Sequence, residues 1–266
     1  MDKFYTCEYT VGLVIEKLKQ FVDIDCRDIV IEPSAGDGSF LKKLDYDNVI
    51  GIDIEPEADG ITKCDFFDFV FPSGYEKIHV VGNPPFGKNG SLALKFLKRS
   101  MEYAESVSFI LPKSFKKESF LMKLPYNFEL AFQTDIQKYS FLVKGEKYDV
   151  PCIFQIWKRN NDGTLRTYEK LHPVGYSFVK KEEFHHAAFR RVGGKSGQIT
   201  TDTDECNVNC YYFIRFDPDV DLSIVERLRR VSFDERDDTV GPRSISKREL
   251  IRKYNQILGR VNENNI

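Results

Sequence analysis

The first regular pattern of apolar residues lies between residues 9 and 22 and has the period of a helix. Val11, Val14, Ile15 and Leu18 recur at intervals of three and four residues, and polar residues fill most of the positions between them. This spacing predicts an amphipathic helix whose apolar face packs on a sheet.

Short apolar runs typical of buried strands follow it, and segments with helical spacing separate some of them. The predicted strands lie near residues 28–32, 48–53, 60–64, 77–82, 106–111, 128–134 and 150–157. The predicted helices lie near residues 38–44, 90–104 and 114–122. Such alternation predicts an α/β fold, in which a mainly parallel sheet has helices on both faces and binds ligands at the carboxyl ends of its strands.

A polar turn, Asn160-Asn161-Asp162-Gly163, follows the last of these strands and marks a candidate boundary. We therefore predict one domain over residues 1–160 and a second region over residues 161–266. The second region has an aromatic strand at 211–216, and its helical patterns lie near 221–230 and 246–259. It is expected to be an α+β unit.

The composition of the chain indicates its cellular location more clearly than its function. The chain of 266 residues has a formal net charge of −2, so any nucleic-acid binding depends on local basic clusters. The six cysteines have no paired spacing, and neither a signal peptide nor a membrane-spanning run is visible. We expect an intracellular protein, cytoplasmic or nuclear, with no membrane partner. Cys206 and Cys210, with His185 and His186 upstream, lack a second ligand pair at zinc-site spacing, so no metal is predicted.

The step Asn83-Pro84-Pro85-Phe86, at the end of a predicted strand, carries the most specific chemistry. The prolines lack backbone donors, so the Asn83 amide oxygen and the Pro84 carbonyl remain as two acceptors for a substrate NH₂ group. Phe86 offers a flat face to the ring that carries the amine. The alternative is a proline-rich turn that precedes a helix.

Three upstream segments have the features of a nucleotide-like site. Gly36 and Gly38 allow a tight turn and close approach of a ligand after a buried strand. Asp53 ends the next strand, where doubly wound folds bind a ribose. Asp65 precedes Phe66, a pair suited to the amine and ring of adenine.

Together and in this order, these segments resemble the class I S-adenosylmethionine-dependent methyltransferases, specifically the gamma-type N6-adenine enzymes. The resemblance covers residues 4 to about 158 and includes Phe4-Tyr5-Thr6, the Glu-Pro-x-x-Gly-x-Gly loop and Ser108-Phe109-Ile110-Leu111-Pro112. It implies a Rossmann-like methyltransferase fold with a seven-stranded sheet and S-adenosyl-L-methionine as cofactor. The cofactor residues that it implies are Thr6, Glu32, Ser34, Gly36, Gly38, Asp53, Ile54, Asp65 and Phe66.

The resemblance also implies how a target base is held. Catalysis falls to Asn83, Pro84, Pro85 and Phe86, and Phe141 corresponds to an aromatic that stacks a flipped base; core packing is its alternative role. Arg190 and Arg191 open one of the three densest basic clusters of the second region, which is expected to bind the target. DNA is the favoured partner and RNA the alternative, whereas a glutamine amide in a protein fits Asn-Pro-Pro but is disfavoured by Phe86. The sequence does not predict the oligomeric state.

Overall fold

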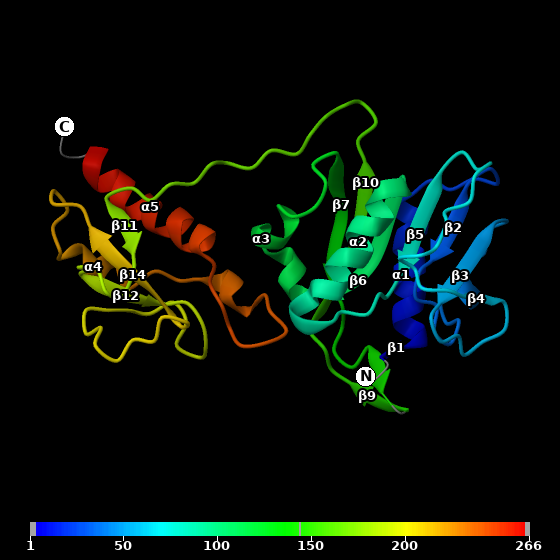
Figure 1. Cartoon of the computed structure of the whole chain (residues 1–266), viewed down its shortest axis with the longest axis horizontal. Helices are drawn as coiled ribbons and strands as arrows, with labels where there is room; N and C mark the ends of the chain where they lie inside the picture. Colours follow the sequence, from blue (N-terminus) through cyan, green and yellow to red (C-terminus); the bar gives the residue numbers. More distant parts are fainter. Residues whose placement is uncertain (1–3, 144, 264–266) are drawn as a thin grey trace. The chain divides into compact units, whose positions relative to one another are not determined.

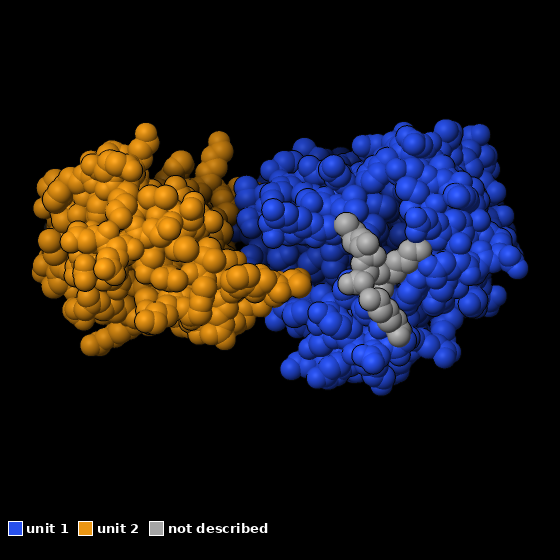
Figure 2. All heavy atoms as spheres, turned by 60° about the horizontal axis from the view of Figure 1, so that its bottom comes forward, with its two compact units in different colours: residues 1–167 blue, residues 168–266 orange. Residues whose placement is uncertain are grey.

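The computed structural model describes residues 4–143 and 145–263 and divides the chain into two compact units (Figure 1). Unit 1 comprises Met1–Thr167 and unit 2 comprises Tyr168–Ile266, coloured blue and orange in Figure 2. The terminal residues 1–3 and 264–266, which the sequence analysis assigned to the two domains, lie outside the described residues. Each unit is treated below by itself.

Unit 1 is built on one seven-stranded sheet with the order β4-β3-β2-β5-β6-β10-β7. Neighbouring strands from β4 to β6 are parallel, and β10 alone runs antiparallel to both β6 and β7. The predicted fold class, a Rossmann-like methyltransferase fold with a mainly parallel seven-stranded sheet, is therefore confirmed. The strands are β2 (Ile29–Glu32), β3 (Val49–Asp53), β4 (Ile61–Lys63), β5 (Ile78–Gly82), β6 (Ser106–Pro112), β7 (Phe128–Asp135) and β10 (Cys152–Arg159).

Helices cover both faces of this sheet because its strands are apolar on both sides. Ile29 and Ile31 belong to a cluster with α2 (Ser91–Tyr103), whereas Val30 between them belongs to a cluster with α1 (Glu8–Phe21). The predicted N-terminal helix is thus α1, whose buried residues include Val11, Val14, Ile15 and Leu18.

The chain reverses its direction of travel across the sheet between β2 and β5. It moves outward from β2 to β3 and β4, and then returns to place β5 on the other side of β2. Loops that leave the carboxyl ends of β2 and β5 therefore diverge, and the crevice between them is the usual ligand site of a doubly wound sheet.

Two predicted helices are shorter than expected. Only one 3₁₀ turn, η1 (Leu41–Lys43), forms in the segment 38–44, because Leu44 is already extended toward β3. The segment 114–122 is divided into η3 (Lys113–Lys116) and α3 (Glu118–Leu121), since Lys117 between them is extended. A further 3₁₀ turn, η2 (Lys88–Gly90), precedes α2.

A small antiparallel sheet, which the sequence did not predict, adds to unit 1. It consists of β1 (Tyr5–Thr6), β8 (Phe141–Val143) and β9 (Glu146–Tyr148). Thr6 is paired with Phe141, so the segment before α1 is held in an extended conformation.

Unit 2 is a four-stranded antiparallel sheet in the order β11-β14-β12-β13, with helices packed on one face. Tyr254 and Leu250 of the C-terminal helix are fully buried against Phe189 and Ile214 of the sheet. The elements are β11 (Tyr176–Val179), β12 (Ala187–Arg190), β13 (Ile199–Thr200), β14 (Tyr211–Phe216), α4 (Ile224–Leu228), η4 (Asp234–Asp237) and α5 (Lys247–Glu263).

Candidate functional site

The ends of β2 and β5 meet at the point where the chain reverses. Glu32 is the last residue of β2, and Gly82 ends β5 directly before Asn83. A Cβ atom on residue 82 would lie 3.3 Å from Cγ of Glu32, which would then have to shift, and the φ of +153° at this position also favours glycine. The sheet therefore places the Glu32 carboxyl and the Asn83 amide at the same edge, where a doubly wound sheet usually binds its ligand.

Glu32 is a buried carboxyl group with incomplete hydrogen bonding. Its side chain is 1% exposed, and within the described part of the chain its Oε2 atom has no hydrogen-bond partner. Burial raises the pKa of this carboxyl well above its usual range, and the nearby charges of Asp37 and Asp53 raise it further. A buried acceptor without a partner suits a cationic or N–H group of a ligand.

Asn83 is held at two points, yet one of its acceptors is left over. Its Nδ2 atom donates to Oγ1 of Thr6 over 3.1 Å, and its backbone carbonyl accepts from the Ser34 hydroxyl over 3.2 Å. Its Oδ1 atom is buried and lacks a partner among residues 4–143 and 145–263. The next carbonyl, of the buried Pro84, also accepts no hydrogen bond from the described residues. Two adjacent residues thus each have an acceptor without a hydrogen-bond partner among the described residues.

Thr6, predicted as a cofactor residue, is in contact with this amide. It is 7% exposed, and β1 carries it to the carboxyl edge of the main sheet. Because its hydroxyl oxygen accepts from Nδ2, it orients the Asn83 amide with Oδ1 outward from the pair. Thr6 therefore contacts Asn83 directly, and its predicted contact with the cofactor stays a prediction.

The glycine loop is tied to the end of β3 by Asp53. One carboxylate oxygen of Asp53 accepts from the Gly36 amide over 2.8 Å, and the other accepts from the Glu55 amide over 2.8 Å. Gly36 has φ +50°, and Gly38 closes a turn on the Ala35 carbonyl over 2.8 Å. A carboxylate has about four acceptor sites, so Asp53 retains capacity for two hydroxyl groups.

Tyr5 of β1 contacts this loop, a contact that the pattern of the sequence did not reveal. Its hydroxyl lies 2.7 Å from both carboxylate oxygens of Glu57, and the backbone N–H of Glu57 donates to the Gly36 carbonyl over 3.0 Å. The Tyr5 ring also lies 3.6 Å from where a Cβ of residue 36 would be. No local signal could indicate this, because Tyr5 and Glu57 are 52 positions apart.

Phe66 was predicted to contact the cofactor, but its neighbour Phe67 is the more exposed of the two rings after β4. Phe66 is 2% exposed and stacks on Phe96 in the core, with ring centroids 5.1 Å apart. Its neighbour Phe67 is 38% exposed, and Asp65 accepts from the Phe67 amide over 2.9 Å. Ile54, at the end of β3, is also exposed. The open apolar side chains near Asp53 and Asp65 are therefore Ile54 and Phe67, rather than Phe66.

Phe86 and Phe141, the two aromatic residues predicted to hold a base, differ in exposure. Phe86 is partly exposed and packs against both core clusters of unit 1, and its carbonyl accepts from the amides of Leu92 and Ala93 at the start of α2. Phe141 is 1% exposed and belongs to the core cluster of α1, which agrees with its packing alternative. Pro85 is exposed.

Lysines gather after the carboxyl ends of β5 and β6. Lys88 follows β5, and the segment after β6 contributes Lys113, Lys116 and Lys117. Lys116 is paired with Asp135 over 2.7 Å. Since β5 and β6 are parallel, these lysines follow strands that end at the same edge of the sheet as Asn83; Lys88 is exposed, whereas Lys117 is buried.

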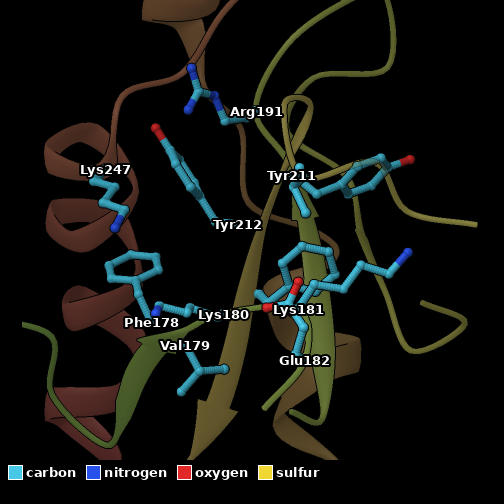
Figure 3. A pocket seen from close by; sticks show the side chains of 11 residues that line it. Phe178, Val179, Lys180, Lys181, Glu182, Arg191, Tyr211, Tyr212 and Lys247 are labelled. Atoms are coloured by element: carbon cyan, nitrogen blue, oxygen red, sulfur yellow. The ribbon is translucent and has the colours of Figure 1, made fainter. Parts of the chain in front are cut away.

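Arg190 and Arg191 of unit 2 face different partners, and Figure 3 shows Arg191 of this pair. Arg190 donates to the Tyr211 hydroxyl over 2.9 Å and to the Val192 carbonyl over 3.1 Å. Arg191 lies over the ring of Tyr212, with 5.0 Å between Cζ and the ring centroid, and it lines a pocket. Arg191 is thus available to a ligand, whereas Arg190 is occupied by its own unit.

The histidines and cysteines form no metal-binding group within the described residues. His79 is buried between Ser106, at 2.7 Å, and Asp28, at 3.4 Å, and burial lowers the pKa of its ring. His185 contacts the Glu183 carbonyl and the Thr203 hydroxyl. Among the helices of the described residues, none has the length and apolar character needed to cross a bilayer.

Comparison with solved structures finds other chains of related architecture. A protein from Listeria monocytogenes, assigned to the class I S-adenosylmethionine-dependent methyltransferases, is 13% identical over 60% of this chain and 62% of that chain, with a TM-score of 0.45. A protein from Pyrococcus horikoshii, assigned as an RNA methyltransferase, is 16% identical over 59% of this chain and 86% of that chain, with a TM-score of 0.45.

A third similar structure is the N-methyltransferase NodS from Bradyrhizobium japonicum, which is 12% identical over 57% of this chain and 94% of that chain, with a TM-score of 0.40. The part of the Listeria protein that matches this chain is 62% of its length, less than two thirds. No family model matches the sequence, and no curated protein matches it. The chemistry of this chain must therefore be inferred from its own residues.

Replacing Glu32 by Gln should stabilise the protein increasingly as the pH rises from about 4.5. The folded-state pKa of Glu32 lies above its unfolded value, so the stability from the protonated carboxyl is complete below about pH 4.5 and is lost as the pH rises through the folded pKa. The amide of Gln stays neutral throughout. The Tm of Glu32→Gln should therefore exceed that of the wild type by an amount that grows between about pH 4.5 and 7.5.

Thermal unfolding followed by circular dichroism at about pH 4.5, 6 and 7.5 measures this difference. Glu129→Gln, at an exposed position of the same unit, is the matched control and should leave the profile unchanged. A gain for Glu32→Gln that is equal at every pH would show that the carboxyl does not titrate in this way.

Proposed function

We propose that this chain is an S-adenosyl-L-methionine-dependent methyltransferase that methylates the N6 amine of adenine in nucleic acid, with DNA as the favoured target and RNA as the alternative. The observation that carries the proposal is the buried, unpartnered Oδ1 atom of Asn83 beside the open carbonyl of Pro84. An exocyclic amine has two N–H donors, and this pair offers two acceptors at adjacent positions.

The residues of the crevice fit the proposed cofactor. Asp53 keeps two acceptor sites for ribose hydroxyls, and Asp65 with exposed Ile54 and Phe67 suits an adenine ring and its amine. The buried Oε2 of Glu32 suits the cationic amine of a methionine moiety. When bound, S-adenosylmethionine supplies an electrophilic methyl group.

Asn83 and Pro84 act on the target amine. The nitrogen lone pair of an aromatic amine is delocalised into the ring, which makes the nitrogen a weak nucleophile. Hydrogen bonds from both N–H groups to Oδ1 of Asn83 and to the Pro84 carbonyl favour a more tetrahedral nitrogen, whose lone pair is then available. Because these acceptors are fixed by Thr6 and the rigid prolines, catalysis rests mainly on positioning and needs no histidine base.

The surroundings of Asn83 support adenine in a polyanion rather than a small amide. The partly exposed ring of Phe86 favours a planar ring, and base stacking on an aromatic is worth about 1–3 kcal/mol. Lys88 and Lys113 lie at the same edge of the sheet, where they would meet phosphates. DNA is favoured over RNA because the order of the sequence motifs resembles that of DNA-modifying enzymes.

Replacing Asp53 by Ala should weaken binding of S-adenosylmethionine by about 1–3 kcal/mol, since ribose hydroxyls would lose a charged acceptor and the Gly36 loop would lose its anchor. Isothermal titration calorimetry measures the effect. Asp59→Ala, at an exposed position of the same segment, is the control and should bind like the wild type. Equal affinity of the two variants would remove Asp53 from the site, and an absence of heat with wild-type protein would refute the cofactor.

The product of the reaction distinguishes the candidate substrates. The protein is incubated with methyl-labelled cofactor and separate pools of DNA, RNA and cell protein, each of which is then digested and analysed by mass spectrometry. We expect N6-methyladenine, because two acceptors and an aromatic face reward a planar ring that carries an NH₂ group. Single-stranded DNA should react at least as well as duplex, since the cost of unpairing a base is absent. Label on glutamine, cytosine or guanine would contradict the proposal.

A further inference from the structure

Unit 2 has a pocket of about 320 Å³ beside the open end of its edge strand. β11 pairs with residues 213–216 of β14, so Tyr211 and Tyr212 of β14 extend beyond the end of β11. The chain after β11 turns away and borders the space that this leaves. Its lining includes two aromatic residues, Phe178 and Tyr212, and two cationic residues, Arg191 and Lys247.

These residues form a cluster of two rings and two cations. The rings of Phe178 and Tyr212 meet edge to face at 5.6 Å and 67°. Nζ of Lys247 lies 4.7 Å from the Phe178 centroid and 5.5 Å from that of Tyr212, and Cζ of Arg191 lies 5.0 Å from the latter. Figure 3 shows the Tyr212 ring between Lys247 of α5 and Arg191 after β12. The cluster therefore unites elements that are distant in the sequence.

The positive charges of this cluster have no ion-pair partner among the described residues, although Glu182 lines the same pocket. In the part of the chain that the structure describes, neither Arg191 nor Lys247 forms an ion pair, and Nε of Arg191 is buried without an acceptor. The pocket also contains Lys180 and Glu182, whereas Nζ of Lys181 is bound to the carbonyls of Asp204 and Cys206. A buried guanidinium N–H without a partner calls for an acceptor from outside, such as a phosphate oxygen.

We propose that this pocket binds one nucleotide of a single-stranded nucleic acid, with the phosphate at Arg191 and Lys247 and the base against Tyr212 and Phe178. This inference rests on the proposed function, because it names the form in which unit 2 holds the nucleic acid. Cations interleaved with aromatic rings are the means by which proteins hold an unstacked strand.

The size and composition of the pocket select the strand form. Its volume is at the lower end of the range for small-ligand sites, about 300–1,000 Å³, and is sufficient for one base. In a duplex the faces of the bases are stacked and unavailable to Tyr212. A single strand exposes both the base face and the phosphate. The rings of the cluster can contact the base face, and its cations can contact the phosphate.

The test measures binding of labelled strands of about 12 nucleotides to the whole chain by fluorescence anisotropy, without cofactor. Oligouridine and oligothymidine contain no adenine, so their binding does not depend on the proposed methylation. We expect both to bind more tightly than a duplex of the same length, and the RNA and DNA arms identify the preferred sugar. Tighter binding of the duplex would overturn the proposal.

Variants separate the contribution of the phosphate from that of the base. Arg191→Gln with Lys247→Gln should weaken oligouridine binding about tenfold and lower the slope of log affinity against log salt by about 1 to 1.5. Tyr212→Leu should weaken it about tenfold but leave binding of inorganic polyphosphate unchanged, and Tyr212→Phe should keep the affinity because the ring remains. Equal losses for polyphosphate and oligouridine on Tyr212→Leu would refute the base contact.

Lys195→Gln and Arg230→Gln remove one charge each at exposed positions of unit 2 outside the pocket. Their affinities should stay within about twofold of the wild type, and a loss equal to that of Lys247→Gln would indicate a general electrostatic field. If Tyr212→Leu does not fold, Tyr212→Phe and Lys247→Gln still decide the matter.

Photocrosslinking locates the base directly. Oligouridine with 5-iodouridine should crosslink to peptides that contain Phe178 or Tyr212, as identified by mass spectrometry. Crosslinks confined to unit 1 would contradict the assignment, and so would tighter binding of a phosphoserine peptide than of oligouridine. Loss of methylation with retained oligouridine binding would instead refute the proposed function alone.

Discussion

The contact between the ends of β2 and β5 is the constraint on which the crevice depends. Glycine at position 82 lets the two strands close on each other, so that Glu32 and Asn83 border one space although 51 positions of the chain separate them. From there Ser34 and Thr6 fix the Asn83 backbone and amide, and Asp53 fixes the glycine loop. Asn83 and Asp53 are thus oriented by hydrogen bonds within the protein, which is how a site gains precision before the ligand arrives.

Much of unit 1 could be predicted because its strands are continuous apolar runs that end in polar residues. Asp53 and Gly36 could be paired from the order of the elements alone, since parallel strands end at one edge. The contact of Thr6 with Asn83 could not be predicted, because it depends on β1 pairing with β8, and two- or three-residue strands leave no periodic signal. Phe66 and Phe67 are adjacent, and only packing against Phe96 decides which ring is buried.

The predicted lengths of the short helices were wrong for a related reason. Apolar spacing over residues 38–44 fits one helical turn, yet Leu44 is already extended toward β3, so the helix stops at η1. In unit 2 the aromatic strand was visible as a run, but the pocket beside it was not. The pocket depends on where β11 ends relative to β14 and on α5 bringing Lys247 to Phe178, and both are tertiary features.

The central claim is that Oδ1 of Asn83 accepts a hydrogen bond from the target amine, and the rate of single-turnover methylation of an adenine-containing strand tests it. Asn83→Ala should lower this rate about 10²–10³-fold, as removal of one transition-state contact does, while the affinity for S-adenosylmethionine stays within a few-fold. Asn161→Ala, at an exposed position of the same unit, should react like the wild type. A wild-type rate for Asn83→Ala would contradict the account.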